Sequence, residues 1–181
     1  MTAHRSFRLE VWTGGQTGVD RAGFDAALEL GIPIAGWVPK GRLAEGGPVP
    51  ERYAPLHETE SPDYAIRTRL NVQETDATLV FTMGASGGGT LETIETARRC
   101  ERPLLVIDLD RTGAADAAAG VSQWLETLFT TRAALRLNIA GPRASQAPAA
   151  YAAVREVLRL VLAPHAFGVR TPDGFRSDRA S

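Results

Sequence analysis

The feature that most constrains the fold is a pattern that occurs three times: a strand-like apolar run, a glycine-containing turn, and a segment with helical spacing. The turns are residues 13–18, 83–90 and 141–148. Strands that alternate with helices are typical of an open, mostly parallel sheet covered by helices on both faces. We therefore expect an α/β fold, a single three-layer domain around a mostly parallel sheet of about five or more strands.

The apolar patterns place the individual elements. Strands are predicted at 7–13, 32–38, 77–82, 103–109 and 135–140, and helices at 19–30, 61–74, 90–99, 119–132 and 148–163. Ser61 is the expected N-cap of the second helix. The continuous apolar run 103–109 suggests a strand buried on both faces. We expect the strand order 2-1-3-4-5, a domain over 1–163 and a polar tail over 164–181.

Composition narrows the class of protein. The chain has 181 residues, a net charge of −1 and 44% hydrophobic residues, which indicates one soluble domain and makes nucleic acid an unlikely partner. One cysteine excludes a disulfide framework, and the three histidines match no metal spacing. No signal-like or membrane-spanning apolar segment is present. We expect a cytoplasmic protein with no metal site and no membrane partner.

The first turn, TGGQTGVDRA over residues 13–22, is a candidate anion site. A helix N-terminus leaves backbone N–H groups unpaired at a positive dipole end, and glycines allow a ligand to approach closely. Gln16 and Thr17 add polar side chains between Gly14, Gly15 and Gly18. Neither common nucleotide fingerprint matches, however, so an ordinary strand-to-helix turn remains the alternative.

All strand-to-helix turns of a parallel sheet lie at its carboxyl edge, where ligands bind at the point at which strand order reverses. We therefore expect the three turns and the irregular loop 39–56 to converge on one crevice. The ligand-binding candidates from these later segments are Lys40, Arg42, Gly87, Gly88, Gly89, Thr90 and Arg143. Lys40 is the only lysine among 20 basic residues, and it suits a point contact to phosphate, although a solvated loop lysine is equally compatible.

Catalytic residues are less well defined. Asp20, Glu92 and Asp108 are carboxylates near the ligand edge, and Arg67 is the arginine of the second helix that could face the crevice. Two of these carboxylates also have a structural alternative. Asp20 could cap its helix, and Asp108 could be a polar strand end.

Six segments together resemble a known family. They are GGQTGVDRAGFDAAL, GWVPKGRLAEGGPVPERY, YAIRTRLNVQETDATLVF, SGGGTLETIETA, PLLVIDLD and LNIAGPRASQAP, within about residues 8–160. The resemblance is to the family named "putative molybdenum carrier", a circularly permuted YpsA-like group of the SLOG superfamily. It implies a Rossmann-like fold, shared with the cytokinin-activating phosphoribohydrolases (LOG proteins) and with DprA. It also implies a crevice for a nucleotide-like ligand or a phosphorylated pterin, with the molybdenum cofactor or a nucleotide as the candidate ligand.

Comparison with the phosphoribohydrolases separates binding from catalysis. Their motif is Pro-Gly-Gly-x-Gly-Thr-x-x-Glu, and Gly87, Gly89 and Thr90 match it. The position of the catalytic glutamate holds Thr93, and Glu92 lies one residue earlier, about 100° away around a helix. The family's active-site arginine corresponds to Arg67. The resemblance therefore implies a phosphate cradle with an altered acid/base position.

The function predicted from the sequence is a binding protein for a phosphate-bearing ligand, either the molybdenum cofactor or a nucleotide. The alternative is a phosphoribohydrolase-like enzyme that acts on nucleotides or nucleotide-derived signals. The apolar stripe of the last helix is wide enough for core packing and a subunit contact, so a homodimer or higher homo-oligomer is expected.

Overall fold

The computed structural model describes residues 8–84 and 87–166, and the predicted tail from 167 onward lies outside the described residues. Five strands form one sheet in which every neighbouring pair is parallel. In the order in which they pair they are β2 (Ile34–Ala35), β1 (Arg8–Trp12), β7 (Ala134–Ala140), β5 (Ala77–Thr82) and β6 (Leu104–Asp108). The predicted α/β class with a mostly parallel sheet is confirmed.

The predicted strand order 2-1-3-4-5 is wrong. The last strand, β7, lies in the centre of the sheet, where it hydrogen-bonds β1 on one side and β5 on the other. The prediction followed chain order, but the connection from β6 returns across β5 before β7 begins. As a result, the third turn, and not the second, directly neighbours the first.

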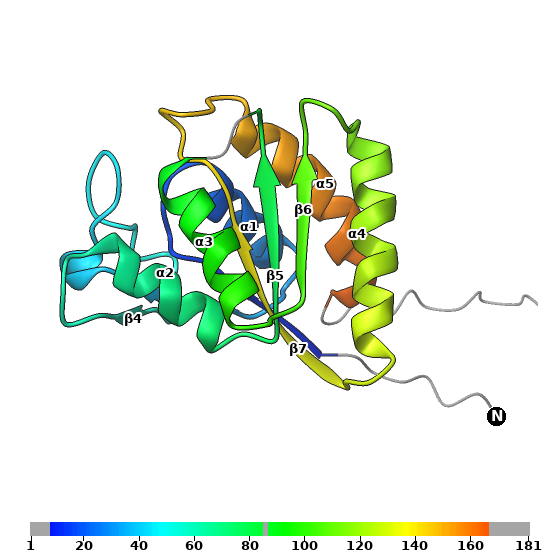
Figure 1. Cartoon of the computed structure of the whole chain (residues 1–181), viewed down its shortest axis with the longest axis horizontal. Helices are drawn as coiled ribbons and strands as arrows, with labels where there is room; N and C mark the ends of the chain where they lie inside the picture. Colours follow the sequence, from blue (N-terminus) through cyan, green and yellow to red (C-terminus); the bar gives the residue numbers. More distant parts are fainter. Residues whose placement is uncertain (1–7, 85–86, 167–181) are drawn as a thin grey trace, which may run out of the picture.

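Helices cover both faces of this sheet (Figure 1). On one face lie α2 (Tyr64–Gln73) and α3 (Gly88–Arg99). On the other lie α1 (Val19–Glu29), α4 (Ala114–Phe129) and α5 (Ala150–Leu162), with α5 packed between α1 and α4. The chain thus forms three layers, and none of the helices in its described part is long and apolar enough to cross a membrane.

The predicted second strand is divided in two at Gly36. A Cβ there would lie 2.0 Å from the carbonyl oxygen of Thr13, and the φ of +148° also favours glycine. After this glycine the chain leaves the main sheet, and β3 (Trp37–Val38) pairs with β4 (His57–Glu58) in a small parallel sheet. Between them lies the expected irregular loop, with a single 3-10 turn, η1 (Lys40–Arg42).

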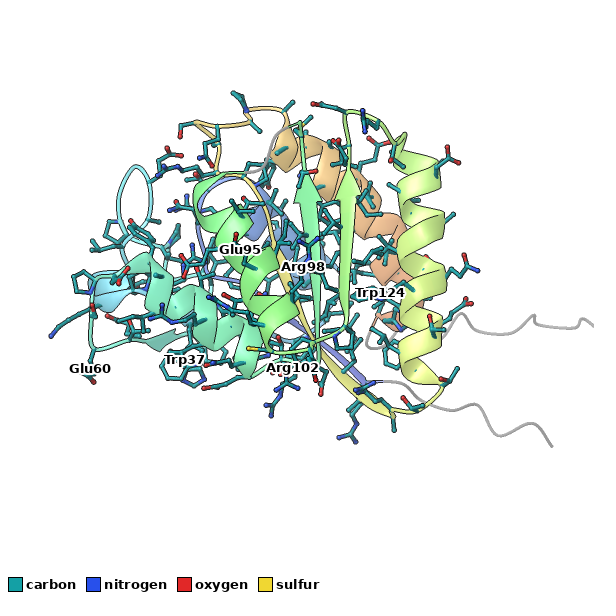
Figure 2. The ribbon with its side chains drawn as sticks, viewed as in Figure 1. Trp37, Glu60, Glu95, Arg98, Arg102 and Trp124 are labelled. Carbon is teal, nitrogen blue, oxygen red and sulfur yellow. The ribbon has the colours of Figure 1, made fainter. Side chains whose placement is uncertain are left out.

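The small sheet fixes the position of α2. The Asn71 side chain accepts a hydrogen bond from the backbone N–H of Trp37 at 2.8 Å and donates one to its carbonyl at 2.9 Å. Asn71 is 2% exposed, so both bonds form away from water. Figure 2 shows Trp37 beside α2. A buried side chain therefore holds α2 against β3 through two bonds.

Two predicted helix starts require correction. Helix α2 begins at Tyr64, and its N-cap is Asp63, whose carboxylate accepts a bond from the N–H of Ala65 at 2.9 Å, whereas Ser61 lies before the cap. Helix α4 begins at Ala114, before the predicted start at 119, because the alanine-rich stretch is already helical.

Burial across the sheet also differs from the prediction. All six residues of β5 are buried, but β6 lies at the edge and Val106 is 38% exposed, so burial on both faces was wrong for residues 103–109. The α5 residues Val154, Val157, Leu158, Val161 and Leu162 are buried in the core. The subunit contact predicted for this helix stays a prediction.

Candidate functional site

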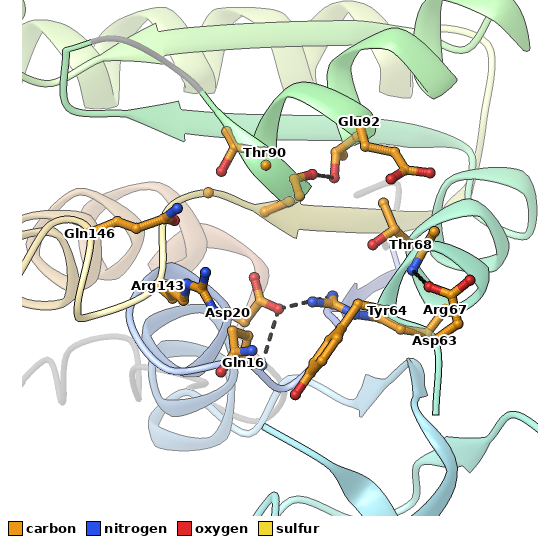
Figure 3. Close-up of a pocket in the computed structure, with 16 residues that line it drawn as sticks. Gln16, Asp20, Asp63, Tyr64, Arg67, Thr68, Thr90, Glu92, Arg143 and Gln146 are labelled. Atoms are coloured by element: carbon orange, nitrogen blue, oxygen red, sulfur yellow. Dashed lines mark hydrogen bonds and ion pairs between the residues drawn. The ribbon is translucent and has the colours of Figure 1, made fainter. Parts of the chain in front are cut away.

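A cavity of about 340 Å³ opens at the carboxyl edge of the sheet (Figure 3). One wall comes from the start of α2, with Tyr64, Arg67 and Thr68. Another comes from the start of α3, with Gly88, Gly89, Thr90, Glu92 and Thr93. The first and third turns complete it through Gln16, Asp20, residues 140–141, Arg143 and Gln146. Segments far apart in the chain therefore meet here because parallel strands place their following turns at one edge.

The lower wall of the cavity contains a buried ion pair. Nη1 of Arg67 lies 3.3 Å from Oδ2 of Asp20. The Arg67 side chain is 13% exposed and the Asp20 side chain is 4% exposed. Burial is the largest influence on the Asp20 carboxyl and raises its pKa, while the Arg67 charge and hydrogen bonds from the backbone of Gln16 and Gly14 act in the opposite direction. A buried charge of this kind requires its partner.

Gly14 makes room for the arginine. A Cβ at this position would lie 1.5 Å from Nη1 of Arg67, so the guanidinium packs directly on the glycine backbone. The Nε of Arg67 is buried and has no hydrogen-bond acceptor among the described residues. Buried donors without partners are uncommon, and this one belongs to a side chain that lines the cavity.

Three N–H groups of the first turn are bonded within the protein. Gly15 donates to Oγ1 of Thr13 at 3.0 Å, Gln16 to the Asp20 carboxylate at 3.1 Å, and Thr17 to Oε1 of Gln16 at 3.0 Å. The N–H of Val19 donates to the carbonyl of Pro142. Side chains and the third turn thus supply the acceptors that a bound anion would otherwise provide.

The start of α3 differs from the first turn. Within the described part of the chain, no acceptor receives a hydrogen bond from the backbone N–H of Gly88, Gly89 or Thr90. These residues line the cavity, and Gly87 precedes them as the N-cap without a side-chain cap bond. A helix start whose N–H groups have no acceptor among the described residues, and whose dipole end is positive, therefore borders the cavity, and such a helix start suits phosphate and other oxyanions.

The third turn is tied to the first by Glu45. Its Oε2 accepts a bond from Oγ1 of Thr17 at 2.7 Å and another from the N–H of Ser145 at 3.2 Å. The N–H of Glu45 donates to Oε1 of Gln16 at 2.7 Å. Hydrogen bonds from Ser145 and Thr17 lower the pKa of Glu45, so its charged form stabilises this contact. The long loop therefore joins two turns that carry cavity residues.

The charges around the cavity are mixed. Its lining includes two guanidinium groups and three carboxylates, those of Arg67, Arg143, Asp20, Asp63 and Glu92. Arg67 is paired with Asp20, and Glu92 lies 3.7 Å from Arg69. Arg143 is an exposed rim cation. An anion at the start of α3 would thus find the helix end and Arg143, with hydrogen-bonding groups on the other walls.

Comparisons with known proteins agree with this architecture. The sequence profile of the circularly permutated YpsA SLOG family matches residues 11–162. A crystal structure of a "Putative molybdenum carrier protein" from Syntrophus aciditrophicus SB superposes with a TM-score of 0.81. The two sequences are 43% identical, and the match covers 87% of this chain and 96% of that chain. The chain belongs to the circularly permutated YpsA SLOG family. Comparison with curated proteins finds no match.

In this member of the family, the position of the phosphoribohydrolase glutamate faces the cavity. Thr93 lines it and is 4% exposed, and its hydroxyl donates to the carbonyl of Gly89 at 2.8 Å. Glu92, one residue earlier, also lines the cavity, on the side of Arg69. A hydroxyl bonded to its own helix thus occupies the position at which the phosphoribohydrolase motif has glutamate.

The structure brings part of the predicted site together. Among the predicted ligand-binding residues, those in the cavity lining are Gln16, Gly88, Gly89, Thr90 and Arg143. Among the catalytic candidates, Asp20, Arg67 and Glu92 line it, whereas Asp108 lies outside and accepts bonds from the N–H groups of Gly84 and Asp110. Gly87 lines a smaller cavity of about 260 Å³ that shares Thr90 and Gln146 with the first.

The other predicted residues lie behind the wall or away from it. Thr17 and Gly18 contact the third turn, where a Cβ on Gly18 would lie 2.4 Å from the Pro142 carbonyl, and Gly15 packs on Val49. Lys40 is exposed, outside the cavity. Arg42 donates to the carbonyls of Val49, Pro50 and Tyr53, so its guanidinium holds the loop together.

Several lining residues were not predicted. They are Asp63, Tyr64, Ala65, Thr68, Thr93, Ala140, Gly141 and Gln146. Tyr64, Arg67 and Thr68 follow helical i, i+3, i+4 spacing, so the prediction of Arg67 as the inward-facing residue also indicates the other two. Gln146 carries no comparable signal in the sequence, because its position depends on the path of the third turn.

Proposed function

We propose that this protein binds a phosphate-bearing small ligand, the phosphorylated pterin of the molybdenum cofactor or a nucleotide, in the cavity between α2 and α3. The observation that carries the proposal is the start of α3, where Gly88, Gly89 and Thr90 line the cavity and their backbone N–H groups have no acceptors among the described residues. A phosphate placed there would accept hydrogen bonds from these N–H groups and would lie at the positive end of the helix dipole.

The rest of the cavity fits the remainder of such a ligand. Its volume of about 340 Å³ lies within the range for small-molecule sites. Tyr64 is 41% exposed on the rim, where a planar heterocycle could stack on its ring. The carboxylates of Asp20 and Glu92 and the hydroxyl of Thr68 are acceptors for the amino and hydroxyl groups that pterins and nucleosides carry.

Binding without cleavage is favoured by the residue at position 93. An N-glycosidic hydrolysis requires a general acid or base near the scissile bond. Thr93 has neither a carboxylate nor a free hydroxyl. The choice of the molybdenum cofactor as ligand is supported by the Syntrophus protein, which is described as a "Putative molybdenum carrier protein".

The test is identification of a ligand that copurifies with the protein from its own host, by native mass spectrometry with metal analysis, followed by titration of that ligand. A pterin with molybdenum supports the carrier function and a nucleotide supports nucleotide binding. Release of a free base from any nucleoside monophosphate would instead favour the phosphoribohydrolase-like enzyme. Copurification of no phosphate-bearing ligand, with no binding in titrations of nucleotides or pterins, would refute the proposal.

A matched pair of exposed cations localises the site. Arg143→Gln removes a cation from the cavity rim and is expected to weaken binding about tenfold or more, the size of one charge-assisted hydrogen bond. Lys40→Gln removes one charge outside the cavity and is expected to leave the affinity unchanged. Equal losses from both variants would indicate a general effect of charge and not a site at this cavity.

A further inference from the structure

We propose that Asp20 is the residue that determines how many anionic groups this cavity accepts: its carboxylate fills the first glycine turn and leaves room for one phosphate, at the start of α3. The inference rests on the proposed function and adds a specificity determinant to it. The N-cap of α1 is Gly18, so Asp20 does not cap the helix, and its carboxylate is bonded to Gln16 and Arg67 instead.

The contacts of the carboxylate are those of a bound anion. It accepts the N–H of Gln16 at 3.1 Å and a guanidinium N–H of Arg67 at 3.3 Å. Backbone donors of a glycine turn together with an arginine are the typical groups of a phosphate site. The protein thus supplies its own anion to the first turn.

Two further N–H groups of the turn are also bonded within the protein. The Gly15 and Thr17 N–H groups are bonded to the side chains of Thr13 and Gln16. At the start of α3, in contrast, the N–H groups of Gly88 to Thr90 have no acceptors in the described part of the chain. Both helix starts border one cavity, and both turns are rich in glycine. Because their N–H groups are bonded differently, the two turns have different roles.

A second anion would meet an unfavourable environment next to Asp20. The Asp20 side chain is 4% exposed, and in such a poorly solvated place two negative charges repel each other strongly. Burial already raises the pKa of this carboxyl, so its charge is sustained by Arg67 and the turn N–H groups. A diphosphate would have to displace the carboxylate to reach the same donors.

The selectivity test uses inorganic phosphate and pyrophosphate as probes, titrated by calorimetry at one pH and ionic strength. Asp20→Ala empties the turn and frees Arg67, and Glu92→Ala is the matched control that removes one carboxylate from the same cavity but not from the turn. We expect Asp20→Ala to raise the affinity ratio of pyrophosphate to phosphate about tenfold or more over wild type, and Glu92→Ala to change it much less.

The outcomes separate the inference from the proposed function. If wild type binds phosphate but Asp20→Ala leaves the ratio unchanged, or Glu92→Ala shifts it equally, Asp20 is a structural residue and the inference is overturned while binding at the cavity stands. If no protein of the three binds either probe, both proposals are overturned.

A second measurement on the wild-type protein does not depend on the stability of the variant. Crystals soaked in arsenate, a phosphate analogue located by its anomalous scattering, are expected to show the anion at the N–H groups of Gly88 to Thr90, with Asp20 still bonded to Gln16. Arsenate on the N–H of Gln16, with the carboxylate displaced, would overturn the inference. Arsenate at neither helix start would overturn it together with the proposed function.

Discussion

At the scale of single residues, side chains that look like ligand-binding groups in the sequence hold the cavity together. Gln16 bonds the N–H groups of Thr17 and Glu45, and Thr17 bonds Glu45 and Ala144. Each of these contacts joins segments more than 25 residues apart, apart from the neighbouring Gln16 and Thr17. Polar residues in a glycine turn therefore serve the turn itself as readily as a ligand.

Glu45 is the residue at which this network can be tested by pH. Its pKa is lowered by hydrogen bonds from Ser145 and Thr17, so its contribution to stability is fully present above the ordinary value of 4.5 and is lost as the pH falls through the lower folded-state value. We expect Glu45→Gln to be less stable than wild type at neutral pH, with a difference that narrows as the pH falls below 4.5.

Urea unfolding at a series of pH values measures this difference. The control is Glu51→Gln, which removes an exposed carboxylate of the same loop and is expected to match wild type throughout. A deficit in Glu45→Gln that stays constant down to acidic pH would show that the ionised carboxylate is not what stabilises the contact.

At the scale of secondary structure, the sequence predicts the elements better than their ends. The helical spacing of apolar residues and the positions of Gly18 and Gly31 predict both ends of α1 to within one residue. The start of α2 was misplaced because Ser61, Pro62 and Asp63 all carry N-terminal signals, and only the three-dimensional path decides which side chain reaches the free N–H. The α2 residues that line the cavity begin at this start, with Tyr64.

The cap of α2 gives a prediction at this scale. Asp63→Ala removes the acceptor of the Ala65 N–H and is expected to lower the free energy of unfolding by about 1 kcal/mol. Ser61→Ala, which removes a bond to the Asp63 N–H outside the helix, is expected to cost about 0.5 kcal/mol or less. Denaturant unfolding of the ligand-free proteins measures both free energies of unfolding. An equal or larger decrease in Ser61→Ala would indicate that Ser61 is the N-cap.

At the scale of the whole molecule, strand order was the part that the sequence did not predict. Patterns of 77–82, 103–109 and 135–140 all indicate strands, but an apolar run does not specify its neighbours in a parallel sheet. Chain order places consecutive strands side by side, and that rule holds only in part. The convergence of turns at one edge was predictable because it depends on parallel direction alone, whereas the contact of the first turn with the third depends on β7.

The central place of β7 has a consequence for cooperativity. Leu137 is fully buried on β7, which bonds both β1 and β5, so Leu137→Ala is expected to lower the free energy of unfolding by about 2–5 kcal/mol. Val106→Ala, on the edge strand β6, is expected to cost about 0.5 kcal/mol or less.

Since β7 links the two sides of the sheet, the weakened protein should still unfold in one transition. Far-UV circular dichroism and tryptophan fluorescence, with Trp12 on β1, Trp37 on β3 and Trp124 on α4 as reporters, should then give the same midpoint. Two separate midpoints in Leu137→Ala, or an equal loss in Val106→Ala, would contradict a sheet that is held together at β7.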